Sequence, residues 1–226
     1  MNIEIASNYE DDHLNKINYD GSPFKCDIEF HNGATNNIIN INGEITVSQL
    51  KIHCLCNNAL INIGKVIKGK LNIQTGEDCK ITIKDNLACG SAKLFAAEGC
   101  SIYIGEDCMF ATGINIKTHD HHPIFDVLTE ERLNISRDII IEDHVWFCEN
   151  VYITKGSIIK SGSIIGYGSF VSGCIPNNCI AAGVPAKIIK KNIAWEPALL
   201  NWDKPYYKPN AKCINKSKFW SITKDI

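Results

Sequence analysis

The amino-acid sequence predicts an all-β fold, a parallel β-helix of hexapeptide repeats. Large apolar residues recur every six positions, at Ile141, Phe147, Ile153, Ile159, Ile165 and Val171. Three places after each of them stands His144, Asn150, Gly156, Gly162, Gly168 or Cys174. Gly and Asn are residues that accept the positive φ of a tight corner. An α-helix does not repeat every six residues, so this period indicates a chain that turns regular corners and stacks its coils.

The repeat divides the 226-residue chain into three parts. Residues 1–40 carry no six-residue pattern and are expected to form an N-terminal extension. Residues 41–190 are expected to form the β-helix. Its first coils are longer than eighteen residues, because apolar residues there recur about every twenty positions, at Ile41, Ile63, Ile83 and Ile104. Residues 191–226 follow the last repeat and are expected to form an aromatic tail that packs on a solenoid flank or a neighbouring subunit.

The strict pattern breaks at Lys117 and resumes after Asp138. A break of this length inside a regular solenoid predicts an inserted loop, residues 117–138, and such loops often carry function. The loop opens with the densest cluster of titratable groups in the chain, the segment His119-Asp120-His121-His122. It also holds both arginines of the sequence, Arg132 and Arg137.

Composition narrows the class of protein. The net charge of −2 gives no reason to expect a nucleic-acid partner or an anionic membrane surface. No apolar run reaches the length of a membrane span, and the chain does not start with a secretion signal, so we expect a cytoplasmic protein without membrane insertion. The eleven cysteines include no Cys-x-x-Cys pair. They are expected to act as small buried packing residues.

Three segments of the repeat resemble the hexapeptide-repeat acyltransferases, and most closely their sugar and polysaccharide O-acetyltransferase branch. These are Ile141–Val151, Ile165–Ser169 and Gly183-Val184-Pro185-Ala186-Lys187. The resemblance covers roughly residues 60–190. It implies a left-handed coil, acetyl-CoA as co-substrate, and a homotrimer whose active sites lie between subunits.

Acyl transfer to a hydroxyl needs a base, and histidine suits this role because its pKa lies near neutrality. The pattern of the related O-acetyltransferases places the base at His122, with His121 as the alternative. Asp120 or Asp126 would orient the imidazole. The three loop histidines together with His144 could instead hold zinc. Their spacing does not favour this, and we expect no metal.

Binding residues follow from the same resemblance. Trp146 is expected to contact the acceptor, with Arg132 and Arg137 as further acceptor contacts. A backbone N–H near Phe147 and Cys148 is expected to stabilise the oxyanion. Glycine lets the pantetheine arm approach the backbone and lysine meets phosphates. The cofactor contacts are therefore expected at Gly166, Gly168, Ser169, Ala182, Gly183, Pro185 and Lys187.

The sequence therefore predicts an acetyl-CoA-dependent O-acetyltransferase that acts on a carbohydrate, either a surface polysaccharide or its precursor. The hydroxyl would attack the thioester directly. An N-acetyltransferase acting on a nucleotide-linked amino sugar is the first alternative, since the base chemistry is similar. A metal-dependent β-helix enzyme and a non-catalytic scaffold are the others. A scaffold would show regular outward threonine ladders, which the sequence lacks.

Overall fold

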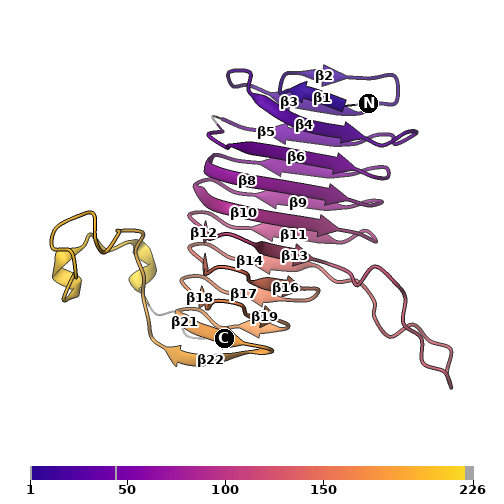
Figure 1. The fold of residues 1–226 in the computed structure, drawn as a ribbon. Coiled ribbons are helices and arrows are strands. Elements are labelled where there is room, and N and C mark those ends of the chain that lie inside the picture. The colour runs from indigo at the N-terminus through magenta and orange to yellow at the C-terminus, as the bar shows by residue number, and fades with distance from the viewer. Residues whose placement is uncertain (1, 44, 222–226) are drawn as a thin grey trace.

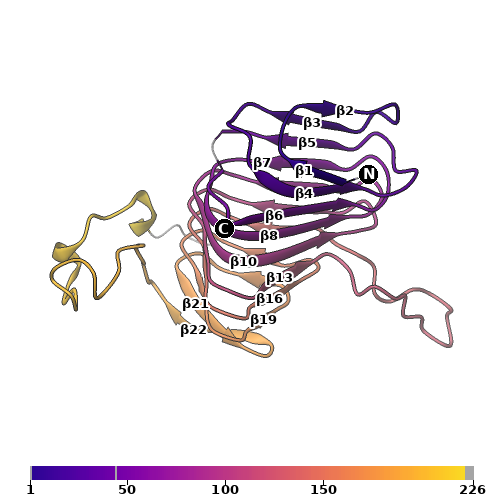
Figure 2. The ribbon, with the colours of Figure 1, turned by 45° about the horizontal axis from the view of Figure 1, so that its top comes forward.

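The fold is known from a computed structural model that describes residues 2–43 and 45–221. Strands stack as successive coils along one axis, and nearly all of them pair in parallel (Figures 1 and 2). The parallel β-helix predicted from the six-residue repeat is confirmed. Ile41, Ile63, Ile83 and Ile104 lie in register on neighbouring strands, as their spacing predicts.

The strands form two sheets. The nine-stranded sheet contains β2 (Tyr9–Glu10), β3 (Lys16–Tyr19), β5 (Ile38–Ile41), β7 (Leu60–Ile63), β9 (Lys80–Ile83), β11 (Ser101–Ile104), β14 (Ile139–Ile141), β17 (Ile158–Ile159) and β20 (Cys174–Ile175). The thirteen-stranded sheet contains β1 (Asn2–Ile5), β4 (Lys25–Phe30), β6 (Gln49–Cys54), β8 (Val66–Thr75), β10 (Leu87–Ala96), β12 (Met109–Phe110), β13 (Ile114–Lys117), β15 (Trp146–Phe147), β16 (Tyr152–Thr154), β18 (Ile164–Ile165), β19 (Phe170–Val171), β21 (Cys179–Gly183) and β22 (Ala186–Lys191). Two 3₁₀ helices follow, η1 (Ala211–Cys213) and η2 (Lys218–Trp220).

Each regular coil has three faces. Face 1 contains β12, β15, β18 and β21, face 2 contains β13, β16 and β19, and face 3 is the nine-stranded sheet. The long strand β10 continues across faces 1 and 2, because its first half pairs with β12 and its second half with β13. Strands β8, β6 and β4 extend face 2 toward the N-terminus.

The β-helix begins earlier than residue 41, so the predicted N-terminal boundary is wrong. Ile17 in β3 pairs in parallel with Ile39 in β5, and β4 pairs in parallel with β6. Paired residues lie 22 positions apart between β3 and β5, as in the side-chain hydrogen bond between Asn18 and Asn40, and 24 positions apart between β4 and β6. A coil of this length does not repeat every six residues, which is why the sequence pattern is absent there. At this end of the described chain, β1 and β2 lie outside the parallel stack, because β1 pairs antiparallel with β4 and β2 pairs antiparallel with β3.

The core is a column of stacked side chains inside the coils. Phe110 and Phe147 stack at 4.5 Å between ring centroids, and both are buried. The small inward residues Ser157, Ser163 and Ser169 are buried as well, and each hydroxyl donates to a backbone carbonyl at 2.6 or 2.7 Å. Most cysteines also lie in the core, and burial raises the pKa of the Cys108 thiol to about 12.

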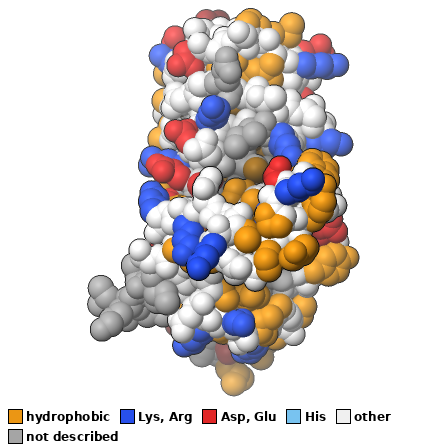
Figure 3. Space-filling model, turned by 90° about the vertical axis from the view of Figure 1, so that its left-hand side faces the viewer, with side chains coloured by type: hydrophobic (Ala, Val, Ile, Leu, Met, Phe, Trp, Pro, Cys, Tyr) orange, Lys and Arg blue, Asp and Glu red, His pale blue; other side chains and the backbone are white. Residues whose placement is uncertain are grey.

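Two segments leave the stack on opposite sides (Figure 1). The chain between β13 and β14 projects as a long loop, and the tail follows β22. The tail returns to the solenoid at Trp195, whose buried ring stacks on His144 at 3.9 Å. Phe219 stacks on the other side of the same imidazole at 4.4 Å. On the tail side, hydrophobic side chains gather right of centre, from the middle of the molecule to its lower part (Figure 3). No helix in the described part of the chain is long and apolar enough to cross a membrane.

Replacing Phe147 with alanine is expected to lower the free energy of unfolding by about 3–5 kcal/mol, because it removes a fully buried ring and leaves a cavity beside Phe110. Denaturant unfolding followed by circular dichroism measures this change. The matched control is Tyr207→Ala on the tail, where the ring is 77% exposed, and it should change stability by less than about 1 kcal/mol. Equal losses in the two variants would contradict this description of the core.

Candidate active site

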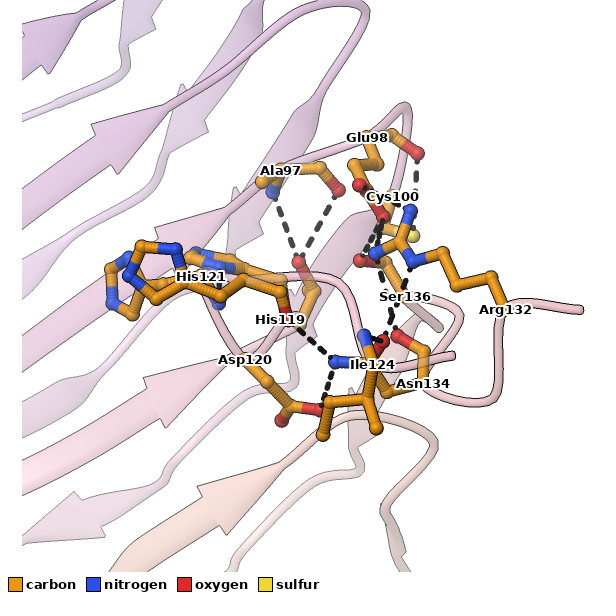
Figure 4. Close-up of polar contacts among 12 residues, drawn as sticks. Ala97, Glu98, Cys100, His119, Asp120, His121, Ile124, Arg132, Asn134 and Ser136 are labelled. Atoms are coloured by element: carbon orange, nitrogen blue, oxygen red, sulfur yellow. Dashed lines mark hydrogen bonds and ion pairs between the residues drawn. The ribbon is translucent and has the colours of Figure 1, made fainter. Parts of the chain in front are cut away.

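The loop leaves the solenoid at the corner between faces 2 and 3, and its base is tied to the preceding coil (Figure 4). Arg132 donates two hydrogen bonds to the Glu98 carboxylate, at 2.7 and 3.0 Å, and the Ser136 hydroxyl donates a third at 2.6 Å. These bonds stabilise the ionised carboxylate and lower the pKa of Glu98 to about 2. Arg132 therefore anchors the loop, and its role as an acceptor contact stays a prediction.

A second anchor ties the loop to the following coil. The Asp120 carboxylate pairs with the Lys155 ammonium, and the same oxygen accepts a hydrogen bond from the Asn134 side chain at 3.0 Å. Both contacts hold the pKa of Asp120 below its usual value. Figure 4 shows Asp120 and His121 pointing in different directions from the loop. Asp120 thus fixes the loop through Lys155 and Asn134, and its role in orienting the base stays a prediction.

His119 is buried beneath the loop. Its ring packs edge-on against Phe95 at 4.4 Å, and its Nδ1 accepts a hydrogen bond from the backbone N–H of His121. Its Nε2 is buried without a hydrogen-bond partner among the described residues. Burial, together with the neighbouring His121 and Lys117, lowers the pKa of His119. His119 is therefore a neutral packing residue that supports the turn of the loop.

His121 lies over face 2. Its backbone has a φ of +68°, which turns the chain so that its ring contacts Phe95 and His119, at 5.5 and 4.4 Å between centroids. Its Nε2 is 3.3 Å from the Lys117 ammonium. An ammonium can only donate, so this nitrogen presents its lone pair to Lys117. The ring also lines a hollow of about 250 Å³ on face 2.

His122 has a fixed backbone and an exposed side chain. Its N–H donates to the Asp120 carbonyl at 2.9 Å, and its carbonyl accepts from the Asn134 side chain at 2.9 Å. The oxygen of the same Asn134 amide accepts from the Ile124 N–H at 2.7 Å. Within the described residues, the His122 imidazole makes no hydrogen bond. The loop thus holds this residue in place while leaving its ring nitrogens available.

Asp126 lies at the tip of the loop, and its role in orienting the base stays a prediction. Its carboxylate accepts the backbone N–H groups of Leu128 and Thr129, at 2.8 and 3.0 Å, and so closes the turn at the loop tip. These bonds lower the pKa of Asp126. The tip exposes large apolar side chains, and Val127 and Leu128 are 91% and 90% exposed.

The other two predicted acceptor contacts, Arg137 and Trp146, lie on different parts of the surface. Arg137 is exposed at the end of the loop, where its side chain passes over Gly156 and its backbone N–H donates to Thr118. Trp146 lies on face 1 beside the tail, 5.8 Å from the Trp195 ring, and not at the corner that carries the loop.

The Cys148 N–H already donates to the Ile165 carbonyl at 2.9 Å, so it cannot serve as the oxyanion donor.

The predicted cofactor contacts come together at the C-terminal end of the stack. Gly166 and Gly168 form the corner between faces 1 and 2, and a side chain at Gly166 would lie 2.8 Å from Ala182. Lys187 pairs with Ala182 across the β21–β22 hairpin, and Pro185 lies in its turn. Ser169 differs, because its hydroxyl is buried between the Gly166 carbonyl and the Gly183 N–H. It fastens this corner and is not available to a cofactor.

The histidines do not converge on a metal site. His144 is buried at the corner between faces 3 and 1, where its nitrogens contact Asp107 and the Trp195 carbonyl. The loop is at another corner. Among the described residues, no group of three or more His, Cys, Asp or Glu side chains could hold a metal ion.

Sequence reasoning missed the residues that support the loop. Asn134 and Lys155 hold Asp120 and the backbone of His122, whereas Phe95 and Lys117 contact His121. Phe95 and Lys117 stand at outward positions of adjacent strands in register, so strand pairing could have identified them. Asn134 has no such signal, because asparagine in a loop ordinarily indicates a turn.

Comparisons with known proteins agree with this description. No family model matches the chain. A polysialic acid O-acetyltransferase from Neisseria meningitidis is 35% identical over 164 residues, which are 72% of this chain and 76% of that protein. A polysialic acid O-acetyltransferase from Escherichia coli O1:K1 is 39% identical over 135 residues, which are 60% of this chain but only 44% of that protein.

Two solved structures share the fold over most of their length. The polysialic acid O-acetyltransferase OatWY matches with a TM-score of 0.71 and 28% identity, over 88% of this chain and 94% of that one. The polysialic acid-specific acetyltransferase NeuO matches with a TM-score of 0.60 and 33% identity, over 83% and 92%. Together with the coil architecture, these similarities show that the chain belongs to the hexapeptide-repeat acyltransferase family, in its sugar O-acetyltransferase branch.

Proposed function

We propose that the protein transfers an acetyl group from acetyl-CoA to a hydroxyl of a carbohydrate, with His122 as the general base. The observation that carries the proposal is the exposed His122 imidazole on a loop anchored to both neighbouring coils. Two relatives of this chain are polysialic acid O-acetyltransferases, which supports a carbohydrate acceptor. Because acetyl-CoA is an intracellular thioester, the reaction would take place in the cytoplasm.

The hydrogen bonds of the three loop histidines support His122 over its neighbours. A base must offer a nitrogen lone pair to the substrate hydroxyl. His119 is buried, and its Nδ1 already accepts from the loop backbone. The Nε2 of His121 faces the Lys117 ammonium. Of the three, His122 alone has a ring that is both exposed and without a hydrogen bond to the described residues.

The reaction needs no covalent enzyme intermediate. The imidazole of His122 removes the hydroxyl proton while the oxygen attacks the thioester carbonyl, so the new C–O bond forms as negative charge develops on the carbonyl oxygen. Collapse of this intermediate breaks the C–S bond and releases the CoA thiolate. The imidazolium then returns its proton to the sulfur, which leaves the base ready for another cycle.

The acetyl-CoA site is proposed at the end of the stack that carries Gly166, Ala182 and Lys187. Small residues at this corner leave room for the pantetheine arm, and Lys187 on the exposed β22 is placed to meet phosphates. Coils lie about 4.8 Å apart. Three coils separate β12 from β21 on face 1, so an extended arm would cover roughly 14 Å between the nucleotide end and the level of the loop.

We further propose a homotrimer in which two chains build each site. In one chain, the loop corner and the Gly166 corner are separated by the width of face 2. Trp146 lies on yet another part of the surface. A neighbouring copy could bring these parts together, and the apolar loop tip at Val127 and Leu128 offers it a contact surface.

His122→Ala is expected to lower kcat by about 10²–10⁴-fold, the usual contribution of a general base. The Kd for acetyl-CoA should stay nearly unchanged, because the imidazole acts on the acceptor hydroxyl. Steady-state kinetics with polysialic acid as acceptor and calorimetric binding of acetyl-CoA measure the two quantities. His121→Ala is the matched control with a smaller expected loss. If His121→Ala abolishes turnover and His122→Ala does not, the base is His121.

Lys187→Glu is expected to raise the KM for acetyl-CoA about tenfold, the equivalent of ~1.4 kcal/mol, because it places a carboxylate near the phosphates. The KM for the acceptor should change little. Mixed trimers of the Lys187→Glu and His122→Ala chains test the shared site. At an acetyl-CoA concentration far below the raised KM, they should be more active than either variant alone, because some interfaces pair two intact halves. A fully active monomer in light scattering would exclude a shared site.

Activity is expected to survive exhaustive chelation, because the proposed chemistry uses a base, a thioester and an acceptor hydroxyl. The measurement is acetyl transfer after prolonged treatment with a strong chelator, compared with an untreated sample. Loss of activity that added zinc restores would instead indicate a metal-dependent enzyme.

A further inference from the structure

Face 2 carries two adjoining hollows that the proposed reaction does not yet use. The larger, of about 400 Å³, lies over β6, β8, β10, β13 and β16. The smaller, of about 250 Å³, ends at the ring of His121. Asn72, Lys93 and Asn115 line both hollows, so together they form one groove that leads across the face toward the loop.

The groove exists because one column of outward side chains becomes short. In successive strands Gln49 pairs with Lys70, and Lys70 pairs with Ser91. The next coil places Gly113 beside Ser91, whose hydroxyl accepts the Gly113 N–H at 2.9 Å. A side chain at Gly113 would lie 2.3 Å from the Asn150 amide oxygen. The small residues at these two positions therefore form the floor of the larger hollow.

The groove is positively charged. Lys70 and Lys93 are exposed at its edge, and among the described residues no carboxylate lies within ion-pairing distance of either ammonium. At its N-terminal end, Lys51 pairs with Asp27 at 2.8 Å, which neutralises both charges. At the other end stands Lys117, beside His121. An anionic ligand would therefore meet unpaired ammonium groups along the groove.

The groove also offers groups that recognise sugars. Asn72 Oδ1 is buried and accepts no hydrogen bond from the described residues. A buried acceptor of this kind calls for a donor, and a sugar hydroxyl is one. Tyr152, with half of its side chain exposed, gives the larger hollow an aromatic wall. Aromatic rings, amides and ammonium groups together suit a carbohydrate that carries carboxylates.

We propose that this groove binds sugar residues next to the one that is acetylated, and that the acceptor is a polymer bearing carboxylate groups. The inference rests on the proposed function, because it takes the loop histidines as the catalytic end of the groove. A chain lying on face 2 would place one sugar near the loop and its neighbours against Asn72, Lys70 and Lys93. Lys70 and Lys93 lie on coils before the loop, whereas Lys187 lies on the hairpin after it.

The test is direct binding of fluorescent polysialic acid to a catalytically silenced His122→Ala protein. The double variant Lys70→Gln/Lys93→Gln in this background should raise the Kd at least tenfold, and the loss should shrink as salt is added. Lys80→Gln/Lys84→Gln is the matched control, since it removes two exposed lysines from face 3 and should leave the Kd unchanged. Neutral dextran should not bind.

Kinetics with the His122-containing enzyme supply the second measurement. The Lys70→Gln/Lys93→Gln variant should raise the KM for polysialic acid and leave the KM for acetyl-CoA unchanged. A rise in the KM for acetyl-CoA alone would assign the groove to the cofactor and overturn the proposal. Unchanged polymer binding in the variant, or equal binding of dextran, would overturn it as well. Lysine-dependent binding without acetyl transfer would support the groove and contradict the proposed function.

Discussion

The structure depends on one constraint, the in-register stacking of parallel coils. The backbone of each coil hydrogen-bonds to the next coil, as in face 3, where Ile63 lies between Ile41 and Ile83. An inward side chain must therefore match the side chains directly before and after it along the axis. A change in coil length is tolerated only where it keeps the strands aligned, so extra residues collect at corners. The 22-residue coils and the long loop both follow this rule.

This constraint also explains why the loop needs such strong anchors. A loop that leaves the stack at a corner lacks the hydrogen bonds between coils that hold the rest of the chain. The structure replaces them with side-chain contacts to both neighbouring coils, through Glu98 on one side and Lys155 on the other. Between them, the Asn134 amide holds the backbone of His122. The result is an exposed imidazole on a loop whose base is held to both neighbouring coils.

The sequence predicts the coils well and the site less well, for a physical reason. Inward residues such as Phe147 and Ile165 are apolar because each fills the core of its own coil, so the six-residue repeat of apolar residues identifies them. The wide early coils lack that repeat, and their start at β3 could not be predicted. The roles of Asp120, Asp126 and Arg132 depend on partners brought near by folding. From composition alone, an acidic residue beside a histidine looks the same whether it bonds that histidine or a distant lysine.

A flat solenoid face presents rows of side chains about 4.8 Å apart but cannot surround a substrate by itself. In the proposed function, recognition and chemistry are therefore separated in space. Face 2 offers repeated, shallow contacts of the kind that suit a repeating polymer, with Lys70 and Asn72 on β8 and Lys93 beside Asn72 on β10. Chemistry requires atoms that approach from another direction, which the inserted loop and a neighbouring copy can supply. Under the proposed function, the inserted loop is the irregular element that carries the chemistry, and this chain places it between β13 and β14, at the edge of face 2.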